Sequence, residues 1–231
     1  MIPALPEVAF GAGYAAQVGL PFGCAVIRGV VREAVRGAVL DGVAHGPPVG
    51  SSVARERIAA FDLQFEQHGH KCPLSHQLRR FEARGPTSSD PLVNALLVCE
   101  LTSGLLMGVQ DLGAIRGGIR LDVAAAGDTF AGARGAIGCR DGEPVVCDGE
   151  GIVASYFQGP DLRTSLTPAS TDLVLFVFSA PGIDRSALVD ALAGASRWFA
   201  PPGVGTTFVG RVSDPHRTAA AEPTTPSGAF T

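Results

Sequence analysis

The side chains best suited to bind a charged ligand gather between residues 68 and 84. The stretch holds Lys71, which is the single lysine of the chain. His76 and three arginines, Arg79, Arg80 and Arg84, follow it closely. Clustered arginine and lysine side chains bind phosphate groups. The whole chain carries a net charge of −4. We therefore expect a nucleic-acid contact confined to this cluster and no broad electrostatic footprint on duplex DNA.

The same stretch also contains potential metal ligands, namely His68, His70, Cys72 and His76. Their spacing matches no standard zinc pattern, and a structural zinc site needs four converging ligands. The short glycine pairs elsewhere lack the phosphate-loop patterns, and the chain has no GxSxG or HExxH motif. We therefore predict no metal site and no cofactor, and we interpret residues 68–72 as a polar loop between two helices.

The composition is that of a chain with a sizeable core. Hydrophobic residues make up 46% and charged residues 17% of its 231 residues, with a mean hydropathy of +0.25. No stretch reaches the roughly 20 apolar residues of a membrane span, and the first residues lack the basic segment of a signal peptide. We therefore predict a cytoplasmic protein without a membrane partner. The five cysteines are scattered without a CxxC pair, so we expect buried free thiols.

Apolar periodicity predicts the elements that must position these side chains. Helices are expected over residues 32–43, 51–69, 73–84, 92–106 and 185–199, and a strand over 23–31. From residue 107 the pattern changes to short segments separated by turn dipeptides, which is typical of antiparallel strands. The predicted class is α+β, with helices in the N-terminal half, mostly antiparallel strands in the C-terminal half and a closing helix at 185–199. We predict a single domain over 1–212 and a disordered tail over 213–231.

Six short motifs follow one another in the order of a known family. They are PLVNALLVCEL from residue 91, GVQDL from 108, GGIRL from 117, GDTF from 127, EPVVCD from 143 and DLRT from 161. Together they resemble the B3/4 domain, the amino-acid-probing module of phenylalanyl-tRNA synthetase β subunits, over about residues 24–181. The resemblance to a stand-alone B3/4 domain implies a B3/4-like fold. In the synthetase this domain hydrolyses misacylated tRNA.

The resemblance also implies a ligand pocket between the helix at 92–106 and the strands after residue 117. The residues assigned to this pocket as ligand-binding are Asn94, Glu100, Gly108, Gln110, Arg120, Asp161, Arg163 and Thr164. Two of them allow a second interpretation, because Asn94 could satisfy the loop around 107–110 and Arg120 could pair with Asp122. A neighbouring carboxylate, Asp111, is predicted to cap the turn that follows it.

The chain departs from the family pattern at the start of the pocket loop. Gly108 stands where the synthetase form has a histidine, and Gln110 and Tyr156-Phe157-Gln158 stand where free-standing relatives have an aromatic residue and a tryptophan. No imidazole is therefore predicted in the pocket. Hydrolysis of an activated aminoacyl ester can still proceed with a positioned water and oriented dipoles.

Three functions remain open at this point. The first is trans-editing, the hydrolysis of a misacylated or non-standard aminoacyl-tRNA. The second is an aminoacyl-tRNA-dependent or amino-acid-processing biosynthetic enzyme, and the third is a non-catalytic module that binds an amino acid or related metabolite. The expected partner is an aminoacyl-tRNA or a free amino acid. The tRNA contact is assigned to Lys71, Arg79, Arg80 and Arg84.

Overall fold

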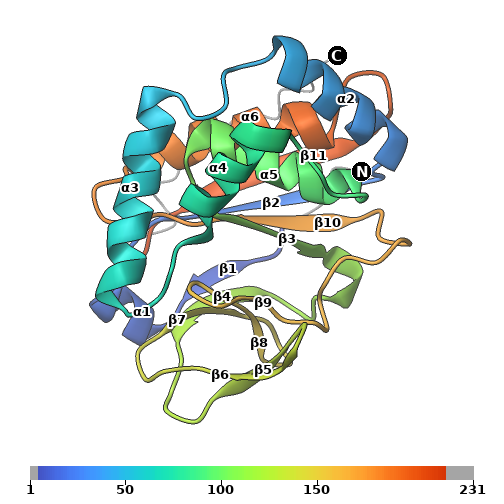
Figure 1. Cartoon of the computed structure of the whole chain (residues 1–231). Helices are drawn as coiled ribbons and strands as arrows, with labels where there is room; N and C mark the ends of the chain where they lie inside the picture. Colours follow the sequence, from blue (N-terminus) through green and yellow to red (C-terminus); the bar gives the residue numbers. More distant parts are fainter. Residues whose placement is uncertain (1–4, 217–231) are drawn as a thin grey trace.

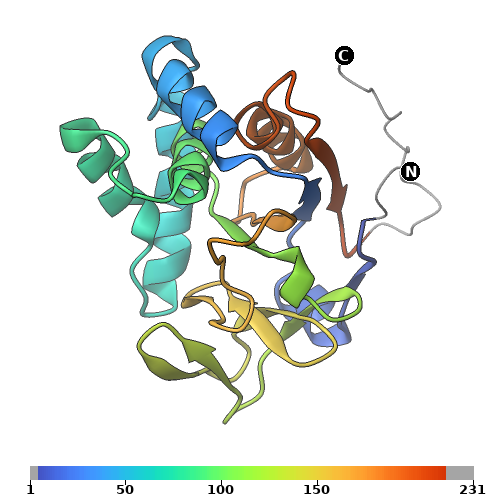
Figure 2. The ribbon, with the colours of Figure 1, turned by 90° about the vertical axis from the view of Figure 1, so that its right-hand side faces the viewer.

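A computed structural model of the chain describes residues 5–216. Five helices form a layer over a four-stranded sheet, and a five-stranded sheet lies on the other side of that sheet (Figure 1). Figure 2 shows the same arrangement from the side, with the helices and the second sheet at opposite ends of the molecule. All of these helices except the last, at 185–199, precede most of the strands along the chain, so the predicted α+β class is confirmed.

The four-stranded sheet has the order β11-β2-β10-β3 and is antiparallel throughout. Its strands are β11 (Thr207–Ser213), β2 (Phe22–Arg28), β10 (Leu173–Val177) and β3 (Met107–Asp111). Every residue of β10 and nearly every residue of β2 is buried. These two strands lie in the middle of the sheet and are covered on both faces, which explains why their sequences are continuous apolar runs.

The helical layer agrees with the predicted elements. Its members are α2 (Arg32–His45), α3 (Ser52–Gln67), α4 (Pro73–Arg84), α5 (Pro91–Ser103) and α6 (Arg185–Phe199). Ser51 caps α3 through a hydrogen bond from Ala54 N, and Pro73 occupies the first turn of α4. The predicted helix at 92–106 ends earlier, because Gly104 adopts a left-handed conformation with φ 74°.

The second sheet has the order β1-β4-β7-β8-β9. Its strands are β1 (Val8–Phe10), β4 (Ile119–Val123), β7 (Pro144–Cys147), β8 (Ile152–Ser155) and β9 (Gly159–Pro160). A hairpin of β5 (Thr129–Gly132) and β6 (Gly135–Gly138) adjoins it. All pairs are antiparallel except β1 with β4, which is parallel. The sequence did not predict β1 or the short helix α1 (Ala12–Gln17) that follows it.

The C-terminal end of the described chain adds an edge strand that was not predicted. β11 pairs with β2 along its whole length and ends at Ser213, where the predicted tail was expected to begin. Residues 217–231 of that predicted tail lie outside the described residues. Within residues 5–216, no helix is both long enough and apolar enough to cross a membrane.

Candidate functional site

A half-open pocket of about 330 Å³ lies where the helical layer meets the two sheets. It is lined by Phe65 of α3, by Lys71 before α4 and by Pro73, the first residue of α4. Residues 106–108 and Gln110 line it from β3 and the turn before it, residues 154–160 from β8 through β9, and Phe178 from the end of β10. The pocket therefore brings together segments that lie far apart in the chain. Two predicted ligand-binding positions line it, Gly108 and Gln110, and so does Lys71.

Four aromatic side chains form one wall of the pocket: Phe65, Tyr156, Phe157 and Phe178. Phe157 meets Phe65 edge-on, with ring centroids 5.1 Å apart, and Tyr156 in the same way at 4.9 Å. Outside the lining, the rings of His68 and His70 stack on Phe157. Two histidines of the predicted polar loop thus support an apolar wall. Groups of three or more potential metal ligands do not occur among residues 5–216.

Gln110 supplies the most deeply buried polar group of the lining. Its Nε2 donates a 2.8 Å hydrogen bond to the Val153 carbonyl, and its Oε1 accepts a hydrogen bond from the Thr164 hydroxyl. Gln110 and Thr164 are both fully buried. Burying an unpaired amide is costly, and these bonds remove that cost. They also join the four-stranded sheet to β8 at the floor of the pocket.

The other polar groups of the lining are likewise engaged within the chain. The Ser155 hydroxyl donates to the buried Glu143 carboxylate and accepts from the backbone N–H groups of Phe157 and Gln158. The Tyr156 hydroxyl donates to the Ser179 carbonyl at 2.9 Å, and burial raises its pKa. The Ser155 hydroxyl, with both lone pairs and its proton in use, has nothing left for a ligand.

Lys71 differs from the rest of the lining. Its ammonium group makes no hydrogen bond or ion pair with the described residues, and the residue is exposed. The lining within residues 5–216 contains no histidine, aspartate or glutamate. The arrangement therefore offers an apolar wall and one available cation, and it offers no side-chain general base.

Glu100 lies behind the pocket and does not line it. Its carboxylate accepts a 3.0 Å hydrogen bond from Met107 N, at the turn that leads into β3. Burial raises the pKa of this carboxyl to about 8, and the hydrogen bond from Met107 offsets the effect only in part. At neutral pH Glu100 is therefore a neutral acid that supports the lining segment from the core side.

Two further residues predicted to bind the ligand, Asn94 and Arg120, instead contact nearby residues outside the pocket. Asn94 holds the loop before α5, since its side chain accepts from Ser88 N at 3.0 Å and donates to Ser88 O at 2.8 Å. The loop that it satisfies is the one before α5 and not the one at 107–110 that the second interpretation named. Arg120 pairs with Asp122 on the same strand, which confirms the alternative of internal pairing. Asp111 accepts from Gly113 N and caps the following turn as predicted.

The remaining predicted residues of the DLRT motif build a loop beside the pocket. Asp161 accepts from the backbone N–H groups of Ala131 and Arg163 at 2.9 and 2.7 Å. The Arg163 guanidinium binds both oxygens of Asp148 and also the Ala114 carbonyl. Burial alone would raise the pKa of Asp148. The hydrogen bonds from Arg163 and from the backbone of Arg116 outweigh burial and hold that pKa below its usual value.

Replacing Arg163 with methionine is expected to destabilise the fold. The substitution leaves the Asp148 carboxylate without its main partner, and we expect a loss of about 2 kcal/mol in the free energy of unfolding at pH 7. Because the pKa of Asp148 is held low in the folded chain, this stabilisation is present above the unfolded pKa of about 4 and is lost as the pH falls. Urea unfolding at pH 7 and pH 3 measures both effects.

Arg116→Met is the matched control for that substitution. The Arg116 side chain binds backbone carbonyls and Glu150, while its contact with Asp148 comes from its backbone N–H and survives the change. We expect a loss below about 1 kcal/mol for this exposed contact. Equal losses in the two variants would show that the Asp148–Arg163 pair does not stabilise the loop as argued.

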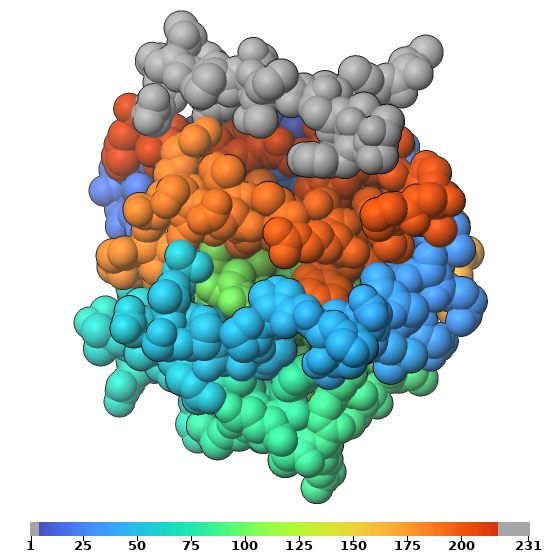
Figure 3. All heavy atoms as spheres, turned by 90° about the horizontal axis from the view of Figure 1, so that it is seen from above, coloured from blue at the N-terminus to red at the C-terminus, as the bar shows by residue number. Residues whose placement is uncertain are grey.

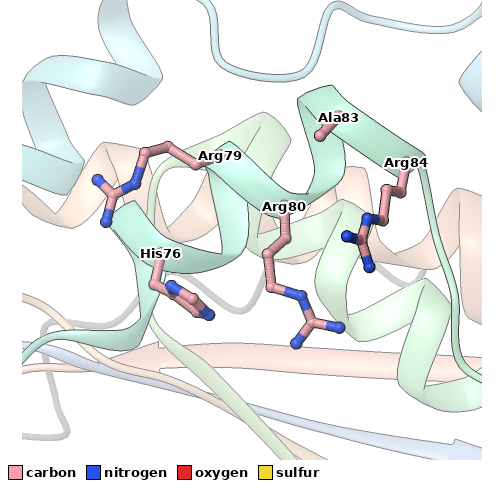
Figure 4. Close-up of a pocket in the computed structure, with 5 residues that line it drawn as sticks. All are labelled: His76, Arg79, Arg80, Ala83 and Arg84. Carbon is pink, nitrogen blue, oxygen red and sulfur yellow. The ribbon is translucent and has the colours of Figure 1, made fainter.

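The arginines predicted to contact tRNA lie on a separate surface. His76, Arg79, Arg80, Ala83 and Arg84 line a shallow groove of about 460 Å³ along α4 (Figure 4). Sequence reasoning found this surface because its charges are contiguous in the chain. It missed the aromatic wall, since Phe65 and Phe178 belong to apolar patterns that are typical of core residues. The one available indication was Tyr156-Phe157-Gln158, where the chain departs from the family pattern.

The comparisons with known proteins support the fold. No protein-family model matches the chain, and no curated protein matches it in sequence. Among solved structures, the chain is similar to an N-terminal fragment of the phenylalanyl-tRNA synthetase β-subunit from Pyrococcus horikoshii. The TM-score is 0.50 at 11% sequence identity, over 90% of this chain and 52% of the fragment. The chain thus spans about half the length of a synthetase fragment whose fold it shares.

Proposed function

We propose that the pocket beside β3 holds the amino-acid part of an aminoacyl-tRNA and that the chain hydrolyses the ester of a misacylated or non-standard aminoacyl-tRNA. One observation carries the proposal. A half-open pocket of about 330 Å³, with four aromatic side chains in its lining, includes Gly108 and Gln110, two positions in the stretch that resembles the B3/4 pocket loop. The proposal is also supported by the fold, which is similar to that of a synthetase β-subunit fragment. The proposed reaction is trans-editing by a stand-alone domain.

The lining favours an apolar or aromatic side chain on the bound amino acid. The polar groups of Gln110, Ser155 and Tyr156 are already hydrogen-bonded within the chain. A ligand hydroxyl placed against the aromatic wall would lose its hydrogen bonds to water and gain none. Phe65, Phe157 and Phe178 instead offer apolar area and edge-on ring contacts. We therefore expect phenylalanine-like or branched aliphatic side chains to bind better than tyrosine or serine.

The proposed reaction uses water as the nucleophile. The water oxygen forms a bond to the ester carbonyl carbon, the bond to the ribose oxygen breaks, and that oxygen leaves as a hydroxyl with a proton from the water. Negative charge develops on the carbonyl oxygen during the attack. We assign its stabilisation to Lys71, the available cation of the lining. The apolar wall contributes by holding the ester in one orientation.

A second candidate function is binding of a free amino acid or related metabolite without turnover. The absence of a histidine, aspartate or glutamate from the lining within residues 5–216 favours it, because general acid–base catalysis normally requires such a group. In this case Lys71 would pair with the ligand carboxylate. The two candidates differ in one observable, which is whether the ester is cleaved.

The test is a deacylation assay over a panel of charged tRNAs, combined with thermal unfolding in the presence of each free amino acid. Trans-editing predicts faster hydrolysis of at least one ester with an apolar amino acid than without the protein. Hydrolysis of none, together with a raised Tm for one free amino acid, would replace it with the binding function. Neither effect for any amino acid would remove the pocket as the site.

Gly108→Leu is the variant that blocks the pocket. A Cβ at Gly108 meets only Phe176, at 4.0 Å, so the leucine side chain has open space toward the pocket and fills it. We expect hydrolysis or ligand-induced stabilisation to fall about tenfold or more, with little change in stability. Gly37→Leu on α2 is the control, since a Cβ there meets no atom within 4 Å. Equal activity of the two variants would place the site elsewhere.

A further inference from the structure

Four basic side chains lie close together on the exposed face of α4. We call His76, Arg79, Arg80 and Arg84 the α4 basic row. Figure 4 shows the side chains of His76, Arg80 and Arg84 on one side of the helix, with Arg79 reaching away past its first turn. None of these side chains makes a hydrogen bond or ion pair with the described residues, and all four residues are exposed.

Most other arginines of the described chain have carboxylate partners. Ion pairs join Arg28 to Asp172, Arg32 to Asp90, Arg55 to Glu82, Arg120 to Asp122 and Arg163 to Asp148. Like charges one turn apart on a helix destabilise it by about 0.2–0.5 kcal/mol per pair. In a chain with a net charge of −4, a row of cations without carboxylates is suited to an anionic partner.

The row leads away from the pocket described above. Lys71 and Pro73 line that pocket, and α4 begins at Pro73. From His76 to Arg84 the helix rises about 12 Å at 1.5 Å per residue. Figure 3, which looks onto the helical layer, shows the α4 segment at the rim of the layer beside α3. A ligand that enters the pocket can therefore continue along an open, positively charged helix.

We propose that the α4 basic row binds the sugar–phosphate backbone of a single-stranded RNA 3′ end whose terminal residue lies at the pocket. The choice of an RNA end rests on the proposed function of the pocket. The arginine guanidinium binds phosphate oxygens through two parallel hydrogen bonds. A single strand fits a short, narrow row, whereas duplex binders need a wider basic surface.

The surface also predicts how the RNA is recognised. None of the strongly exposed large apolar side chains among residues 5–216 is aromatic, so the face offers no stacking platform of Phe, Tyr or Trp for successive bases. The contacts are then made to phosphates. Binding of this kind depends steeply on salt and little on base sequence. Selection among RNAs would come from the group at the 3′ terminus, in the pocket.

The test measures binding of an uncharged, fluorescently labelled RNA of about eight nucleotides that ends in CCA, a length within the usual site size of single-strand binders. Anisotropy titrations are run between 50 and 200 mM salt. Arg80→Glu/Arg84→Glu is compared with Arg134→Glu/Arg197→Glu, whose exposed arginines make no ion pair or hydrogen bond with the described residues. Both doubles change the net charge equally. Thermal unfolding shows that each variant is folded.

The row variant should weaken RNA binding about tenfold or more at low salt and reduce the slope of log K against log salt by about 1.4, at 0.7 per lost phosphate contact. The control double should change both quantities little. An equal loss of RNA affinity in the two double variants would show that the effect comes from net charge and not from the α4 basic row. If the RNA does not bind the wild-type chain, the inference is wrong.

Gly108→Leu separates this inference from the proposed function. It should abolish the effect of the pocket on an aminoacyl ester and weaken binding of the uncharged RNA much less than Arg80→Glu/Arg84→Glu does, because the α4 basic row holds the phosphates. RNA binding that depends on the row, without any hydrolysis or amino-acid binding, supports the inference and removes the proposed function of the pocket. Hydrolysis that persists in Arg80→Glu/Arg84→Glu with unchanged RNA affinity removes the inference and leaves the proposed function in place.

Discussion

Gly104→Ala is expected to lower the free energy of unfolding by about 3–4 kcal/mol, which is the largest effect we predict for a single methyl group. Gly104 ends α5 with φ 74°, a backbone conformation that costs an L-residue about 1–2 kcal/mol. A Cβ there would also lie 2.7 Å from the Ala54 Cα. That atom belongs to the backbone of α3, so α3 and α5 would have to separate, at about 1–3 kcal/mol.

Gly117→Ala isolates the two contributions. Gly117 has the same φ as Gly104, 74°, and a Cβ there meets no atom within 4 Å. This variant should therefore lower the free energy of unfolding by the conformational cost alone, about 1–2 kcal/mol. Chemical denaturation of both variants gives the difference, which measures the close approach of α3 and α5. Equal losses would mean that the helices move apart at no cost. The separation would also displace Phe65, which lines the pocket.

Glu100→Gln is expected to stabilise the chain at alkaline pH. Burial raises the pKa of Glu100 to about 8, and the residue is only 4% exposed. An unfolded glutamate has a pKa of about 4.3. Between these two values the folded chain retains a proton that the unfolded chain has released. Stability contributed by this group is therefore full below the unfolded pKa and is lost as the pH rises toward 8.

The glutamine variant should not show this loss. Its side-chain oxygen can still accept the hydrogen bond from Met107 N, and it has no proton to release. We expect the two proteins to have similar stability near pH 4.5 and the variant to be more stable by about 2–4 kcal/mol at pH 8, below the 1.4 kcal/mol per pH unit that linkage allows. Urea unfolding across this pH range measures the difference.

Glu56→Gln on the exposed face of α3 controls for the change in net charge. A stability difference between wild type and Glu100→Gln that stays constant from pH 4.5 to pH 8 would contradict a raised pKa for Glu100. If the difference does grow, the turn into β3 becomes less stable at alkaline pH. Ligand binding at Gly108 should then weaken over the same range in the wild type and not in the variant.

The sequence by itself determined the helical layer and the α+β class. Ser51, Pro73 and Asp90 mark the starts of three helices through local hydrogen bonds or backbone restriction. The apolar spacing of α3 and α4 then defines their buried faces. These features depend on residues within one or two turns of each other, and for that reason they could be predicted without a structure.

The partners of single polar side chains could be predicted only when they are near in sequence. Asp111 caps the turn two residues on, and Arg120 pairs with Asp122. Gln110 instead meets Thr164, 54 positions away, and Arg163 meets Asp148, 15 positions away. Whether a polar residue faces a ligand or an internal partner therefore follows from how distant segments meet. The motif residues alone do not contain that information.

The pocket itself is the feature that only the tertiary structure decided. Its aromatic wall combines α3, β8–β9 and the end of β10, and each of these side chains also fits an ordinary apolar pattern in its own segment. The parallel pairing of β1 with β4 is equally non-local. The α4 basic row was visible in the sequence because a helix brings residues three and four apart onto one face. Its position next to the pocket was not, since that depends on how α4 packs against the sheets.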